Sequence, residues 1–177
     1  MEIKDSGNRR EFSSGAVRDI AEGKGRCDLL PLDCVGDFFD SLARPEWNPF
    51  YKKADACGSI LMCLNDVVRG TDEKAIVKCI IRFVEFAFED KPGYALMELA
   101  KHYEQGAKKY AERNWQKGIP AHCYIDSCVR HLLKWYDGWD DEPHDRAVLW
   151  NLFGLWWTLR NKPECNDLPY EKEGNEE

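Results

Sequence analysis

The sequence predicts an all-α protein that folds as a helical bundle. Six stretches repeat apolar residues at spacings of three and four, the pattern of one helix face, and they cover residues 28–43, 55–69, 73–89, 94–111, 121–137 and 144–160. No stretch alternates apolar and polar residues for long enough to predict a strand.

Breaker residues separate these helices along the chain. Pro31 suits the first turn of the first helix, and residues 44–49 contain two prolines that end it. Gly70 follows the second helix, where a glycine commonly closes the last turn. Pro92 ends the third helix and Pro163 ends the sixth. Four of the six predicted helices therefore have a physical boundary as well as a periodic pattern.

The third predicted helix, over 73–89, is apolar on nearly every side. A helix of this kind is either buried all round or lies in an interface between subunits. We therefore expect it to serve the core or a homo-oligomer contact.

Composition narrows the class of partner. The chain has 177 residues, which suits a single domain over 1–177, and its net charge is −7. Proteins that bind nucleic-acid polymers gain affinity by neutralising phosphates with Lys and Arg, so an acidic chain argues against that class. A small phosphorylated ligand needs only a local basic cluster, and acidic residues can gather around a divalent cation.

The cysteines and the N-terminal residues indicate the cellular compartment of the protein. The sequence has 8 Cys but no C-x-x-C pair, which argues against structural zinc. Because the polar start does not read as a signal peptide, we expect the thiols to be reduced. The first twelve residues are polar, and no apolar run approaches the roughly 18 residues that span a membrane. We expect a cytoplasmic protein with no membrane partner.

Polar residues interrupt the apolar faces of the fourth and fifth helices. Glu104 falls at the edge of the apolar face, beside small residues; alternatively it forms an ordinary pair with Lys108 on a solvated flank. His131 follows an apolar row and is either a functional group or a satisfied core histidine. Arg130 and Lys134 present positive charge to a phosphate or belong to a solvated, ion-paired face.

Further candidates lie beside the sixth helix and in the loop after the fourth. His144 and Asn151 share one row, because seven residues make nearly two turns. The acidic run at 140–142 either caps this helix or holds Mg²⁺ through its oxygens. Trp115 and Asn114 either stack on and hydrogen-bond a base, or anchor the loop to the end of the bundle.

Together these segments resemble a known family. Residues 23–31 read GKGRCDLLP, residues 103–115 read YEQGAKKYAERNW, and residues 130–132, 140–144 and 150–151 read RHL, DDEPH and WN. They resemble the phage and prophage dATP/dGTP diphosphohydrolases, which look like an outlying branch of the MazG-like all-α nucleotide pyrophosphohydrolases. The resemblance covers residues 8–43 and 94–163.

The resemblance implies an activity and a domain organisation. It implies hydrolysis of dATP and dGTP to the monophosphate and pyrophosphate, with Mg²⁺ (or Mn²⁺ as the alternative metal), by a homo-oligomer in the cytoplasm of a bacterium or a phage-infected host. Residues 28–43 and 94–161 would form the catalytic core, preceded by an extended arm over 1–27. Residues 44–93 would be a helical insertion, and 164–177 a disordered acidic tail.

The predicted site combines metal ligands with phosphate and base contacts. The catalytic candidates are Glu104 and His131, where His131 is either the base or a structural orienter. The metal candidates are Glu104, Asp140, Asp141 and His144. The substrate-binding candidates are Lys24, Arg26, Lys108, Lys109, Asn114, Trp115, Arg130, Lys134 and Asn151.

Two rival functions use the same sequence features. A non-catalytic sponge would bind a nucleotide or a cyclic dinucleotide in the same pocket without hydrolysis. Clustered carboxylates favour the enzyme, because they repel phosphate unless a metal intervenes. A helical interaction protein would instead use 73–89 as a docking surface.

Overall fold

Five long helices carry the fold in the part of the chain that the structure describes. The computed structural model describes residues 7–20, 27, 30–31, 34–35, 51–70 and 74–169. The helices are α2 (Tyr51–Arg69), α3 (Ala75–Ala87), α4 (Pro92–Tyr110), α5 (Ala121–Asp137) and α6 (His144–Asn161), with short 3-10 turns η2 (Asn114–Lys117) and η3 (Pro163–Cys165). The prediction of an all-α bundle is confirmed.

Some predictions fall outside the described residues. The helix over 28–43 is described as helical only at Cys34 and Val35. Lys24 and Arg26 lie outside the described residues, and so does the acidic tail from residue 170 onward.

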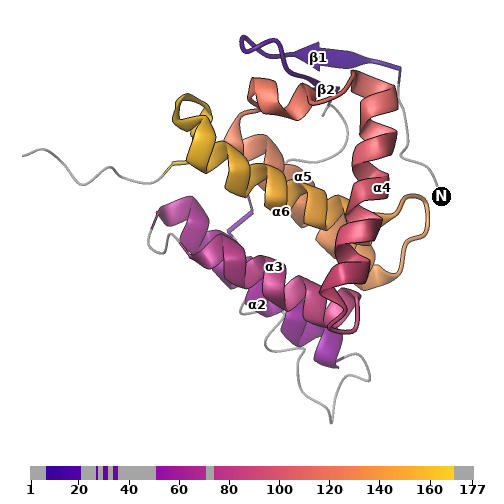
Figure 1. The fold of residues 1–177 in the computed structure, drawn as a ribbon. Coiled ribbons are helices and arrows are strands. Elements are labelled where there is room, and N and C mark those ends of the chain that lie inside the picture. Colours follow the sequence, from indigo (N-terminus) through magenta and orange to yellow (C-terminus); the bar gives the residue numbers. More distant parts are fainter. Residues whose placement is uncertain are drawn as a thin grey trace, which may run out of the picture.

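Helices α5 and α6 form the centre of the bundle (Figure 1). They make the most extensive contact between two described elements, α4 packs on α6, and the α2–α3 pair reaches both central helices. Leu132, Leu149 and Leu152 are fully buried in this core. None of the described helices is long and apolar enough to cross a bilayer. The packing fixes α4, α5 and α6 relative to one another, which matters because all three border the candidate site.

One glycine allows α5 and α6 to approach closely. Gly154 of α6 faces the ring of Tyr124 on α5, and a Cβ atom at this position would collide with that ring. Tyr124 is itself fully buried. Gly154 therefore sets the position of an aromatic ring that lies beneath Arg18, a residue of the candidate site.

Helix α3 divides between the core and the surface. One face, which includes Ile76, Cys79 and Phe83, is buried, and α3 packs against α2 and α6. On the other face, Ile81 is 60% exposed. Buried residues of α2 and α3 belong to the same hydrophobic core as those of α5 and α6. The segment predicted to be an insertion is therefore packed into the bundle wherever it is described.

The structure adds a β-hairpin where the sequence predicts no strand. β1 (Arg9–Glu11) and β2 (Val17–Asp19) pair antiparallel, with Arg10 opposite Arg18. Three residues are too few for an alternating pattern to be recognised, so local sequence carries no signal. Distant contacts hold the hairpin instead: Ser14 donates to the carbonyl of Gly118, and Ala16 is fully buried.

Candidate functional site

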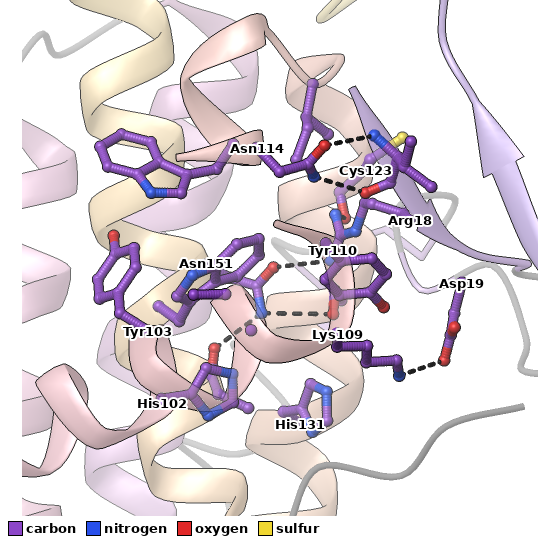
Figure 2. Close-up of a pocket in the computed structure, with 18 of the residues that line it drawn as sticks. Arg18, Asp19, His102, Tyr103, Lys109, Tyr110, Asn114, Cys123, His131 and Asn151 are labelled. Atoms are coloured by element: carbon purple, nitrogen blue, oxygen red, sulfur yellow. Dashed lines mark hydrogen bonds and ion pairs between the residues drawn. The ribbon is translucent and has the colours of Figure 1, made fainter. Parts of the chain in front are cut away.

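A cavity of about 1020 Å³ lies between the hairpin, α4, η2, α5 and α6 (Figure 2). Its size is that of a pocket for a small organic ligand, which typically measures roughly 300–1,000 Å³. Polar and aromatic side chains from all of these elements line it. The cavity is therefore the candidate functional site among the described residues.

One face of α5 forms a polar wall of the cavity. The lining residues of this helix recur every three or four positions: Cys123, Asp126, Ser127, Arg130, His131 and Lys134. Such spacing places side chains on one side of a helix, and the row spans about 16 Å at 1.5 Å per residue. The sequence allows two roles for Arg130 and Lys134, a solvated ion-paired face or a contact with phosphate. In the structure both residues face the cavity.

Arg18 of the hairpin enters the cavity, and sequence patterns do not reveal it. Its guanidinium donates to the carbonyl of Cys123 at 2.8 Å and to Oδ1 of Asn151 at 3.3 Å. It also lies over the rings of Tyr124 and Trp150, at 5.6 and 5.4 Å from their centroids. Burial lowers the pKa of Arg18 from its ordinary value. No carboxylate among the described residues contacts it, so its charge is not locally balanced.

Asn151 orients Arg18. Its Nδ2 donates to the carbonyl of Ala147 at 2.7 Å and to Oγ of Ser127 at 3.3 Å, which leaves Oδ1 to accept from Arg18. The residue is buried, and these contacts fix its rotamer. The predicted substrate-binding residue Asn151 thus lines the cavity and also holds a cation in place.

Three other cations of the wall each have a carboxylate partner. Lys109, whose side chain is 7% exposed, lies 2.9 Å from Asp19. Arg130 pairs with Asp126, one helical turn away, and Lys134 lies 3.2 Å from Asp141. All three were predicted to bind substrate, and all three line the cavity. Their charges are compensated before any ligand arrives.

Two histidines and an aspartate form a hydrogen-bonded chain beside the cavity. Nε2 of His144 lies 2.8 Å from Asp141, and the Nδ1 atoms of His144 and His131 lie 2.9 Å apart. An ionised carboxylate only accepts, so His144 donates to Asp141 through Nε2. A neutral His144 then accepts at Nδ1, and His131 must donate to it. This tautomer leaves the lone pair of His131 on Nε2.

Burial keeps His131 neutral. Desolvation, together with nearby His144 and Arg130, lowers the pKa of His131 well below its ordinary value. The imidazole is therefore in the form that accepts a proton at neutral pH. His131 lines the cavity, and its role as base or as structural orienter stays a prediction.

His102 is a second buried histidine of the cavity wall, and the sequence does not single it out. It is 8% exposed, and its Nδ1 has no hydrogen-bond partner. Burial, with the charges of Arg146 and Lys109, lowers its pKa to about 4. His102 is therefore an uncharged group on the cavity wall at neutral pH.

The predicted metal ligands do not come together. Glu104 is 66% exposed and pairs with Lys108 at 2.8 Å, the alternative that the spacing also allowed. Asp140 is exposed and does not line the cavity. Only Asp141 and His144 are in contact, and they bind each other. Within the described ranges, no group of three or more His, Cys, Asp or Glu residues is arranged to hold a metal.

The register of α4 explains why the Glu104 side chain is exposed, although Glu104 is among the residues that line the cavity. Its buried row runs through Ala95, Glu98, Leu99 and His102, and Glu104 does not fall on it. Glu98, not Glu104, is the buried carboxylate of this helix, where it pairs with Lys101 and Arg146. Lys108 is exposed as well, and it is not among the cavity residues.

Asn114 and Trp115 act as loop anchors. Asn114 pairs with the backbone of Val17 at both ends of its amide, accepting at 3.1 Å and donating at 2.8 Å. The ring of Trp115 lies 5.5 Å from that of Tyr103 and 4.9 Å from that of Trp157. Both residues still line the cavity. Their geometry favours the anchoring alternative, and their contact with a base stays a prediction.

Comparison with known families assigns the chain. The family model described as dATP/dGTP diphosphohydrolase, N-terminal, matches residues 70–168. The chain belongs to this family. The match contains α3 to α6, hence every helix that lines the cavity, and it begins within the segment predicted to be an insertion. No curated protein and no solved structure matches the chain.

Membership of the dATP/dGTP diphosphohydrolase family makes the protein a hydrolase that acts on nucleoside triphosphates. It favours the enzyme over the non-catalytic sponge. The hairpin lies outside the matched residues, so Arg18 comes from a part of the chain that the family model does not include.

Proposed function

We propose that the protein hydrolyses dATP and dGTP to the monophosphate and pyrophosphate. The observation that carries the proposal is the position of the cavity within the matched region: the family residues on α4, α5 and α6 form most of its wall. Positive charge that a triphosphate needs is present on the wall at Arg18, which no carboxylate among the described residues contacts, and the volume suits a nucleotide.

The chemistry needs an activated water and a stabilised leaving group. The oxygen of water bonds to the α-phosphorus, and the bond from that phosphorus to the bridging oxygen of the β-phosphate breaks. Pyrophosphate departs with the bonding electron pair, while the proton of the water passes to a base. We assign the base to Nε2 of His131, because Asp141 and His144 orient the ring through the other nitrogen.

Magnesium enters this proposal with the substrate. The described residues do not assemble the expected ligand set, because Glu104 pairs with Lys108 and Asp141 with His144. In many nucleotide enzymes Mg²⁺ keeps several waters and is bound chiefly by substrate phosphates. We therefore propose Mg²⁺ dependence, with Mn²⁺ as the alternative, and assign no residue of this chain to hold the ion. Such an ion neutralises phosphate charge.

The assembly and location of the protein are proposed separately. We propose a homo-oligomer that works in the cytoplasm and binds neither a nucleic-acid polymer nor a membrane. Large apolar side chains are exposed on α3 and α4, namely Ile81, Tyr94, Leu96 and Met97, and they are the surface that we expect a second copy to cover. Light scattering that gives the monomer mass at micromolar concentration would contradict this proposal.

A product assay tests the activity. The protein is incubated with each of the four dNTPs, with and without Mg²⁺, and the products are separated by ion-exchange chromatography. We expect dAMP and dGMP with equimolar pyrophosphate from the purine substrates, and turnover only with the metal. Release of inorganic triphosphate, or no turnover of either purine dNTP, would contradict the proposal.

A further inference from the structure

The hairpin places two arginines together at one end of the cavity. Arg10 and Arg18 are directly opposite each other across the antiparallel pair, so their side chains lie on the same face of the hairpin. Both line the cavity. Like charges in this arrangement repel, and the positive charge of Arg10 adds to burial in lowering the pKa of Arg18. Without an anion, the arrangement is unfavourable.

No carboxylate among the described residues offsets these two charges. Arg18 donates to a carbonyl and an amide oxygen, and Arg10 donates to Sγ of Cys123 at 3.3 Å. Nε of Arg10 is buried and has no partner. Arg10 and Arg18 are both partly buried, and partial burial of a charge without a counter-charge is unfavourable. The other enclosed cations of the wall have carboxylates, and Arg113 lies exposed to water.

We infer that Arg10 and Arg18 form a receptor for the β- and γ-phosphates of the substrate, the pair that leaves as pyrophosphate. The inference rests on the proposed function for the identity of the ligand. The charge balance selects the phosphate end over the base, because the base is neutral and would leave both arginines uncompensated. The planar guanidinium fork also matches two phosphate oxygens, which a Lys ammonium does not.

The hairpin holds this receptor in position before the ligand binds. Val17, which precedes Arg18, pairs with Asn114 through its backbone, and Asp19, which follows, pairs with Lys109 of α4. Asn151 and the Cys123 carbonyl fix the guanidinium itself. Pre-organisation of this kind lowers the entropy lost on binding. Leaving-group recognition thus depends on a segment outside the matched family region.

Calorimetric titration with inorganic pyrophosphate, in EDTA so that no metal takes part, tests the receptor. We compare the wild type with Arg18→Gln, Arg10→Gln and Arg18→Lys. The matched control is Arg9→Gln, because Arg9 lies on the same hairpin but has a carboxylate partner and does not line the cavity. A charge-assisted contact of this kind is worth about 10- to 100-fold in affinity.

We expect Arg18→Gln and Arg10→Gln each to weaken pyrophosphate binding by at least about tenfold, Arg18→Lys to fall between them and the wild type, and Arg9→Gln to stay within about threefold. Circular dichroism shows which variants are folded. Should Arg18→Gln unfold, Arg10→Gln and Arg18→Lys decide the matter. Two results would contradict the receptor. In one, the folded arginine variants bind pyrophosphate as tightly as the wild type; in the other, the wild type does not bind pyrophosphate.

The titration is separate from turnover. If the wild type releases pyrophosphate from dATP while the folded arginine variants bind pyrophosphate normally, the receptor is wrong and the proposed function stands. If binding depends on both arginines but no dNTP is hydrolysed, the receptor stands and the proposed function is wrong.

Discussion

The hairpin and the outer face of α4 both carry charged residues beside the cavity, but they differ in charge balance. On α4, Glu104 and Lys108 neutralise each other one helical turn apart, in water. On the hairpin, Arg10 and Arg18 repel each other with no carboxylate among the described residues in contact. A screened surface pair is worth little, whereas a partly buried charge without a partner is unfavourable. The second arrangement therefore points to a ligand, and the first does not.

Substitution of His131 should have the largest effect on turnover. We expect His131→Gln to lower kcat by about 100-fold or more, because removal of a general base typically costs that much. The matched control is His122→Gln, since His122 lies on the same helix but pairs with Asp167 near the surface. Steady-state kinetics on dATP compare the two. A kcat within about threefold of wild type in His131→Gln removes His131 as the base.

The packing beneath Arg18 can be disturbed by one methyl group. Gly154→Ala should lower the free energy of unfolding by about 1–3 kcal/mol, because the added Cβ collides with the Tyr124 ring. Gly106→Ala is the same change on α4, where a Cβ meets nothing within 4 Å, and should stabilise by about 0.5–1 kcal/mol. Urea denaturation measures both. Equal effects of the two changes would contradict the described packing of α5 on α6.

The two carboxylates of α4 should separate clearly in stability. Glu98→Gln should destabilise by about 2 kcal/mol, because it removes the counter-charge of Arg146 from a buried position. Glu104→Gln should leave the melting temperature unchanged, since that carboxylate is exposed. Differential scanning calorimetry gives both values. A larger loss of stability in Glu104→Gln than in Glu98→Gln would contradict the described register of α4, in which Glu98 is buried and Glu104 is exposed.

Acid should destabilise the fold through His102. Its pKa is about 4 in the folded protein and about 6.5 when unfolded, so below pH 6.5 the unfolded chain binds a proton that the folded chain does not. The contribution is therefore present above pH 6.5 and is lost as the pH falls toward 4. Between pH 7 and 5.5 we expect a loss of about 1 kcal/mol that His102→Leu removes. Parallel acid sensitivity of the variant and the wild type contradicts this.

The smallest effect on turnover is expected at Glu104, which the sequence predicts to be a metal ligand. Glu104→Gln should leave dATP turnover within about threefold of wild type, because loss of a true ligand or its support costs roughly 10- to 100-fold. Steady-state rates at saturating Mg²⁺ measure it. A loss of tenfold or more would restore Glu104 to the metal site and weaken the contrast with the hairpin.

Periodic patterns predict the helices well because most of them have an apolar row and a breaker residue at the end, such as Gly70 after α2 and Pro163 after α6. They also identify His131, Arg130 and Lys134, since these residues share one face of α5. The rotation of α4 is harder to predict, because Leu96 and Met97 are apolar yet exposed, while Glu98 and His102 are polar yet buried. Partners on other helices, such as Arg146 for Glu98, explain why this face of α4 is buried.

Arg18 is beyond local prediction for a different reason. Its partners Cys123 and Asn151 are 105 and 133 residues away in the chain. It lies in a strand of three residues, too short for a recognisable pattern. Nothing around Arg18 in the sequence distinguishes it from Arg9, which pairs with a carboxylate on the same hairpin.

The position of bond cleavage tests the central claim most directly. dATP is hydrolysed by the wild type in ¹⁸O-labelled water, and the products are analysed by mass spectrometry. Attack on the α-phosphorus predicts one ¹⁸O atom in dAMP and none in pyrophosphate. Label in pyrophosphate or in inorganic phosphate, or the absence of dAMP, would contradict a diphosphohydrolase built on this cavity.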